Sequence, residues 1–319
     1  MLTFHPTPAE RDGAPPTDAV WIDLLNGSEA EIQLIEDHTG LRLPTLDDLA
    51  EIEQSSRQSF ADGVLRLAAP IVAQADTDHP KLSYVGVILT GRVLITVRFD
   101  QLKMFDLTVA KACEPGAGTT SAQVFATLME AFVDRQADLL EIARARLDQV
   151  SHMVFRPSAT SLRRVSRSNL VMRKKLQTIG GVGERISIIR ESLLAVDRMI
   201  PFALEATKDW FDPALAHRLS AVRQDIESLN LFEEHLSNKV QFLLDAVLGF
   251  IGIEQNDIFK VLTIASVVGI FPTLVAGWYG MNFRNMPEYG WTFGYQYGIA
   301  AIVASTILPL LWFKWRGWM

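Results

Sequence analysis

Cysteine is nearly absent from this chain of 319 residues, which has Cys113 alone. A single cysteine cannot form an intrachain disulfide, so a reducing, cytosolic setting is the simple expectation for the soluble part. Basic residues are also in deficit, with 30 Lys and Arg against 37 Asp and Glu and a formal net charge of −7. Neutralising nucleic-acid phosphates needs a basic face, so we expect no nucleic-acid partner. We expect the protein to interact with cations rather than with polyanions.

Neither a cleaved leader nor a catalytic site is expected from the sequence. Residues 1–16 are polar and proline-rich, without the basic and apolar regions of a cleaved signal. The six histidines are scattered, and neither a nucleophile triad nor a zinc-ligand spacing occurs. An enzyme is therefore the weakest functional class, and we predict no catalytic residue and no cofactor.

Charge disappears from two stretches near the C-terminus, residues 261–279 and 295–313. Each has 19 residues, and a helix of that length reaches roughly 28 Å, close to the ~30 Å of a hydrocarbon core. We predict two membrane-spanning helices joined as a hairpin, with the lipid bilayer as a partner. Lys260, Lys314 and Arg316 flank the hairpin, and this inner basic flank predicts that both termini are cytoplasmic.

The remainder of the chain changes character along its length. Short strand-like runs at 20–24, 64–69, 83–89 and 93–98 alternate with helical segments, and Gly91 and Arg92 predict a hairpin between the last two runs. From Ser121 onward apolar residues recur three or four apart, which indicates long helices, with a break or kink at the glycines of 180–183. The predicted divisions are a cytoplasmic α/β domain (1–118), a cytoplasmic helical coiled-coil region (119–212), a stalk helix (213–260), the first span with its following motif (261–282), a periplasmic loop (283–294), the second span (295–313) and a cytoplasmic basic tail (314–319).

The stalk helix cannot bury its apolar stripe alone, so we expect self-association. On a helical wheel, one face of the stalk and first span mixes small, polar and single apolar residues. If several copies surround a symmetry axis, this face would line a water-filled pathway. In the alternative interpretation, its small residues only allow helices to pack closely together. The pore-lining candidates are Asn256, Phe259, Leu262, Ser266, Ile270 and Thr273.

A short motif follows the first span: Gly280, Met281 and Asn282, and then a mouth loop with Met286, Pro287 and Glu288. Neither span contains an acid, so a passing cation would meet carbonyl, amide and hydroxyl oxygens. Mg²⁺ gives up its water reluctantly and suits recognition by such neutral oxygens. Asn282 is the predicted selectivity residue.

These residues resemble the signature of the CorA family of magnesium and cobalt divalent-cation channels. The resemblance covers roughly residues 225–319, including Gly249 to Asn256, and only the general order of the N-terminal part is similar. It implies an α+β membrane protein of the inner membrane, with an α/β/α cytoplasmic domain, a long helical stalk and two C-terminal transmembrane helices in a funnel-shaped homopentamer.

The same resemblance implies import of Mg²⁺, and also of Co²⁺ and Ni²⁺, through a ring of Asn282 side chains. It further implies closure by regulatory Mg²⁺ at acidic sites, for which Asp245 is the best single candidate. Two alternatives remain open. One is a zinc transporter of the same superfamily, possibly proton-coupled, and the other is a membrane-anchored coiled-coil scaffold that conducts nothing and would tolerate Asn282→Ala.

Overall fold

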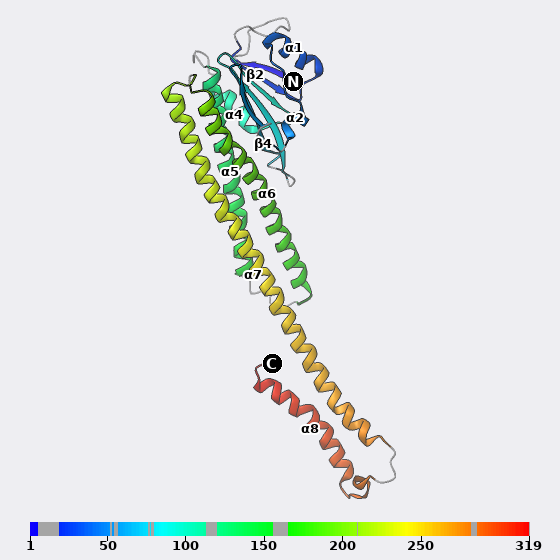
Figure 1. Ribbon diagram of the computed structural model, residues 1–319. Coiled ribbons are helices and arrows are strands. Elements are labelled where there is room, and N and C mark those ends of the chain that lie inside the picture. Colours follow the sequence, from blue (N-terminus) through cyan, green and yellow to red (C-terminus); the bar gives the residue numbers. More distant parts are fainter. Residues whose placement is uncertain are drawn as a thin grey trace. The chain divides into compact units, whose positions relative to one another are not determined.

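The computed structural model describes residues 1–5, 19–51, 53, 57–75, 77, 80–112, 120–155, 165–208, 210–281 and 286–318 (Figure 1). The chain divides into two units, Met1–Leu244 and Asp245–Met319, and each is considered separately below.

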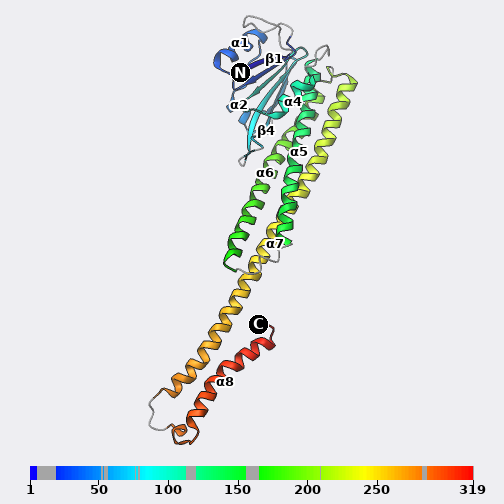
Figure 2. The same cartoon turned by 180° about the vertical axis from the view of Figure 1, so that it is seen from behind.

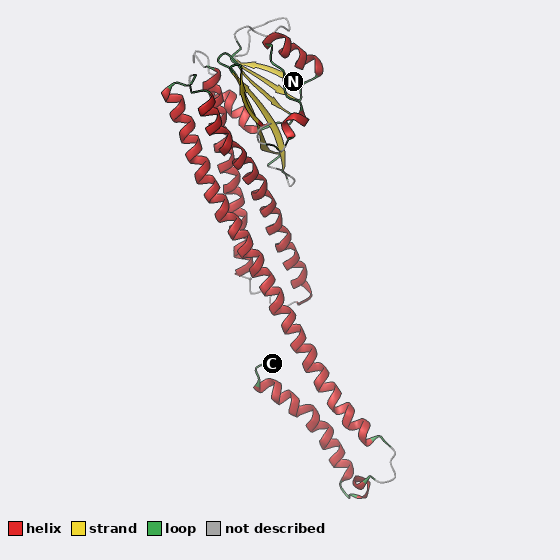
Figure 3. Cartoon of the chain, in the orientation of Figure 1, coloured by secondary structure: helices red, strands yellow, loops and turns green. Residues whose placement is uncertain are grey.

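A six-stranded sheet lies at the N-terminal end of the first unit (Figure 3). Its order is β1-β2-β6-β5-β4-β3, and only the pairing of β2 with β6 is parallel. The four predicted strands are confirmed, as is the turn at Gly91 and Arg92, where β5 and β6 pair antiparallel. The four-residue strands β1 and β3 were not predicted. The strands are β1 (Leu2–His5), β2 (Trp21–Leu25), β3 (Gln58–Ala61), β4 (Val64–Ala73), β5 (Lys81–Leu89) and β6 (Leu94–Arg98).

Helices cover both faces of this sheet, with α1 (Glu29–Thr39) and α2 (Leu46–Ala50) on one side and α4 (Lys103–Ala112) and α5 (Ser121–Phe155) on the other (Figures 1 and 2). The α2 side is so close to the sheet that a Cβ on Gly86 would lie 3.0 Å from a Leu49 methyl carbon. This arrangement confirms the predicted α/β/α domain.

Helices α1 and α2 each begin at a capping box. At α1, Ser28 and Glu31 exchange side-chain and backbone hydrogen bonds, and at α2, Thr45 and Asp48 do the same. Each box satisfies backbone N–H groups that the first turn of a helix leaves unpaired. The box at Thr45 can be predicted from the sequence, because a hydroxyl residue is followed three positions later by the acid Asp48, and the structure confirms it.

The rest of the first unit is a bundle of α5, α6 (Val165–Ala206) and the initial part of α7 (Pro213–Tyr279). Buried leucines and isoleucines such as Leu140, Leu193 and Ile226 fill it. The break predicted at the glycines of 180–183 is wrong, because α6 runs through them without interruption. Gly183 instead permits close approach of α7, since a Cβ there would lie 3.3 Å from Val240 Cγ1.

The second unit contains the end of α7, the short 3-10 helix η2 (Pro287–Gly290) and α8 (Gly294–Trp315). The two predicted apolar stretches are helical: α7 ends at Tyr279, as expected, and α8 extends slightly beyond residues 295–313. These two helices, and the motif that follows the first, position the candidate site.

Candidate functional site

The apolar segments of α7 and α8 contain almost no buried residues. The most apolar 18-residue segments of the two helices have mean hydropathies of 2.1 and 1.6, and 0% and 6% of the residues in these segments are buried. Leu274 and Leu308 are examples, with exposures of 62% and 63%. Both helices are long and apolar enough to cross a membrane, and so much exposed apolar surface is unfavourable in water.

The six pore-lining candidates lie along one side of α7, at intervals of three or four residues, and all are exposed. Their hydrogen bonding differs. The Thr273 hydroxyl donates to the Gly269 carbonyl at 2.8 Å, so its proton is satisfied within the helix. Among the residues that the structure describes, none hydrogen-bonds the side chains of Asn256 or Ser266. A single copy therefore presents this face without closing a site around it.

Gly280 and Met281 mark the C-terminal end of α7. The Gly280 amide donates to the Ala276 carbonyl at 2.9 Å, and the Met281 amide donates to Trp278 at 3.3 Å. A Cβ on Gly280 would lie only 3.2 Å from the Ala276 oxygen, so glycine keeps this turn uncrowded. Asn282, the predicted selectivity residue, lies outside the described residues.

The chain is described again from Met286, which is half-buried. The helix η2 follows directly and begins with Pro287 and Glu288. Here a cavity of about 540 Å³ opens between the end of α7 and the beginning of α8. Its lining is rich in aromatic rings, including Tyr279, Trp291 and Tyr295. Aromatic side chains of this kind favour the interface between membrane and water.

At the other end of the membrane segments, Asp245 is exposed on α7. Within the described ranges, no group of three or more His, Cys, Asp or Glu side chains could hold a metal ion. Lys314 and Arg316 lie at the end of α8, where cations interact favourably with the helix dipole. The Arg316 guanidinium also lies 5.5 Å from the centre of the Trp312 ring.

Comparison with known proteins decides the family. A family model described as "CorA-like Mg2+ transporter protein" matches residues 17–315. The chain belongs to this CorA-like family. The match includes the N-terminal α/β domain, for which the sequence alone showed only a similar order of elements.

Individual relatives of this CorA-like chain cover almost its full length. It is 29% identical to the magnesium transport protein CorA of Pasteurella multocida over 314 residues, 97% of this chain and 95% of the relative. It is 30% identical to the protein of the same name from Escherichia coli over 309 residues, 97% and 94% of the two chains.

A solved structure shows the same fold. The complete structure of the CorA magnesium transporter from Methanocaldococcus jannaschii aligns with a TM-score of 0.79 at 16% identity, and the alignment covers 100% of this chain and 98% of that one. The α/β domain, the long helix and the two apolar C-terminal helices are thus the architecture of a CorA protein.

Proposed function

We propose that this chain forms a Mg²⁺ transport pathway in the inner membrane, as a homopentamer with both termini in the cytoplasm. Support for the substrate comes from the near full-length similarity to proteins named as magnesium transport proteins. Support for the pathway comes from the polar face of α7, whose Asn256 and Ser266 side chains have no hydrogen-bond partner among the described residues.

That face is the observation that carries the proposal. A polar group facing lipid tails loses its water partners and gains none, which costs free energy. If several copies of α7 surround an axis with this face inward, Asn256, Ser266 and Thr273 instead contact water. The same arrangement covers apolar surface between neighbouring copies.

In this arrangement rings of polar side chains alternate with rings of apolar side chains along the pathway. Asn256, Ser266 and Thr273 offer neutral oxygens to the water shell of a cation, while Phe259, Leu262 and Ile270 form constrictions that close by excluding water. Gly280, Met281 and Asn282 stand at the outer mouth, where a ring of Asn282 amides selects hydrated Mg²⁺, and Co²⁺ and Ni²⁺ with it. The mouth loop with Met286, Pro287 and Glu288 supports this ring.

Regulation in this proposal uses the transported ion itself. Intracellular Mg²⁺ occupies acidic sites that combine carboxylates from different copies, and Asp245 is the candidate ligand near the inner end of the pathway. Loss of this Mg²⁺ leaves the carboxylates to repel one another, which loosens the stalks and opens the constrictions. Lys314 and Arg316 lie at the cytoplasmic boundary.

Uptake into proteoliposomes tests the proposal. Purified protein is reconstituted, and entry of Mg²⁺ or Zn²⁺ is measured under an imposed potential or an imposed proton gradient. We expect potential-driven Mg²⁺ entry that falls at least about tenfold in Asn282→Ala, because one ring of amides is lost. Asn238→Ala is the matched control, since Asn238 is an exposed amide on the cytoplasmic part of α7.

Three results would contradict the proposal. Zn²⁺ entry that follows the proton gradient would indicate a zinc transporter of the same superfamily. No flux of either ion would favour a membrane-anchored scaffold. Equal Mg²⁺ flux in Asn282→Ala and Asn238→Ala would remove Asn282 from the selectivity step.

A further inference from the structure

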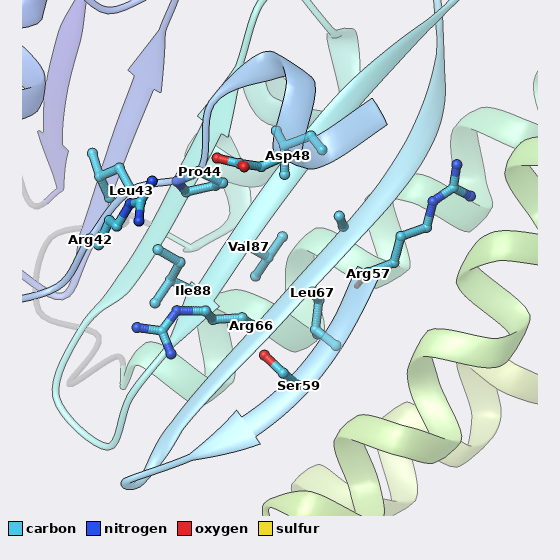
Figure 4. A pocket seen from close by; sticks show the side chains of 12 residues that line it. Arg42, Leu43, Pro44, Asp48, Arg57, Ser59, Arg66, Leu67, Val87 and Ile88 are labelled. Carbon is cyan, nitrogen blue, oxygen red and sulfur yellow. The ribbon is translucent and has the colours of Figure 1, made fainter. Parts of the chain in front are cut away.

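A cavity of about 350 Å³ lies on the α2 side of the sheet, within the first unit (Figure 4). Strands β3, β4 and β5 form its floor, while α2 and the residues that precede it form a wall. This volume is at the lower end of the range for small-molecule sites. The cavity lies in the N-terminal domain, and the proposed transport pathway does not use it.

The charged side chains of the cavity are three arginines, Arg42, Arg57 and Arg66, and one carboxylate, Asp48. Asp48 caps α2: it accepts hydrogen bonds from the Thr45 amide and the Thr45 hydroxyl, both at 2.8 Å. The hydrogen bond from the Thr45 amide, more than the nearby Arg42 charge, lowers the pKa of Asp48. This carboxylate is thus held at the helix end and leaves an excess of positive charge in the cavity.

The three arginines are not equivalent. Arg57 donates from Nε to the Glu51 carbonyl at 2.5 Å, and its guanidinium lies 5.8 Å from the Tyr84 ring centre. Figure 4 shows Arg57 at one end of the cavity and the guanidinium groups of Arg42 and Arg66 together at the other end. Arg42 and Arg66 are therefore the pair available to a ligand.

Arg66 occupies an unexpected position for a cation. It is the third residue of β4, opposite Ile88 on β5 and Ser59 on β3, and its strand neighbours on the same face, Val64 and Ala68, are buried. In the part of the chain that the structure describes, no residue forms a hydrogen bond or ion pair with its guanidinium. A half-buried cation on an otherwise apolar face is unfavourable without an anionic partner.

We propose that this cavity binds a polyphosphate anion, either inorganic or as the tail of a nucleotide. Guanidinium groups match phosphate oxygens in bidentate geometry, and two of them at the same end of one cavity suit neighbouring phosphoryl groups. The Ser59 side chain, opposite Arg66 in register, adds a hydroxyl donor, and the apolar floor around Ile88 accommodates the body of a nucleotide. General attraction of anions does not explain such a site on a chain with a net charge of −7.

Calorimetric titration of the full-length protein in detergent tests this binding. The probes are tripolyphosphate and ATP, each added without divalent cations, and sulfate serves as the control anion. We expect saturable binding of at least one polyphosphate, weakened about tenfold or more in Arg66→Gln and in Arg42→Gln, because each loses a charge-assisted contact. Arg92→Gln, at an exposed turn of the same domain, is the matched control and should bind within about twofold of the parent chain.

The two probes identify the source of the phosphate. Equal affinities indicate recognition of the polyphosphate chain alone, whereas tighter ATP binding indicates added contact with the base, and both results support the site. Arg42 is on an exposed loop, so Arg42→Gln keeps the test valid even if Arg66→Gln fails to fold. Absence of binding at millimolar concentrations, or equal weakening in Arg92→Gln, would overturn the proposal, whatever the outcome for Mg²⁺ uptake.

Discussion

The two units of this chain contain similar apolar residues but treat them in opposite ways. In the first unit, the described side chains include Trp21, Phe105, Phe125 and Phe132, each less than 2% exposed. In the second unit, only Val247 and Phe313 are buried among the described residues. The first unit thus encloses its own apolar core, whereas the second leaves its apolar surface for lipid or for other copies to cover.

This difference separates two sources of stability. Burial within the chain stabilises the α/β domain and the bundle, at roughly 25 cal/mol per Å² of apolar surface removed from water. That contribution is nearly missing from the second unit, where helix formation and the bilayer must replace it. A single sequence therefore encodes one part for water and one part for a membrane.

Cutting the chain between the units should have the largest effect. A fragment of residues 1–244 should remain soluble without detergent and unfold cooperatively, because its core is complete. A fragment of residues 245–319 should require detergent or lipid to stay in solution. Size-exclusion chromatography and thermal melts followed by circular dichroism measure both properties. Aggregation of the first fragment on removal of detergent would show that its core depends on the second unit.

Much of this contrast could be predicted from the sequence, because its signals are local. The charge-free stretches, the strand runs and the Thr45 capping signal each depend on neighbouring residues. The break at 180–183 was wrong because glycine lowers helix propensity by about 1 kcal/mol, and packing against α7 outweighs that cost. Strands β1 and β3 were missed because four residues carry little pattern, and these strands form only as edges of a sheet that exists already.

The two proposed sites also differ in whether their residues are neighbours in the chain. Gly280, Met281 and Asn282 are adjacent in the chain, so they could be recognised by their order. Arg42 and Arg66 are far apart in the sequence and share a cavity only because α2 packs over β4 and β5. Nor does the sequence indicate that Asp23 and Arg98 meet, since this requires the parallel register of β2 and β6.

Ion pairs in the two units should differ by several kcal/mol. The Arg98 guanidinium bonds the buried Asp23 carboxylate, with Nη2 to Oδ2 at 2.7 Å, and the Thr96 hydroxyl donates to the same group at 2.7 Å. Arg98→Gln leaves that carboxylate buried without its cation, so we expect the free energy of unfolding to fall by roughly 3–5 kcal/mol.

The comparison pair is Lys260 and Asp257 at 2.9 Å in the second unit, where the Asp257 side chain is 62% exposed. Asp257→Asn should change the free energy of unfolding by less than about 1 kcal/mol. Denaturant titrations in one detergent measure both variants. Similar losses in the two would mean that burial does not set the strength of these pairs.

The smallest expected effect concerns a carboxylate for which burial in the first unit is unfavourable. Burial raises the pKa of Asp197 above its ordinary value of 3.8, and the Glu227 charge adds to the shift, while Arg223 and Arg198 oppose it. A raised carboxyl pKa means that the folded state disfavours the ionised form. The protonated Asp197 carboxyl therefore contributes to the stability of the folded state. This contribution is fully present below pH 3.8, the ordinary carboxyl pKa, and it is lost as the pH rises through the higher pKa of the folded state.

Asp197→Asn cannot ionise, so it removes the loss of folding stability that accompanies ionisation of Asp197 at higher pH. At pH 8 the variant should melt about one to two degrees above the parent chain, and the gain should shrink as the pH falls toward the ordinary carboxyl value of 3.8, because the parent carboxyl becomes protonated. Thermal melts across this pH range measure the difference, with Asp138→Asn at an exposed position of α5 as a variant of the same charge change. A gain that is constant with pH, or equal in Asp138→Asn, would mean that net charge, rather than the burial of Asp197, sets the effect.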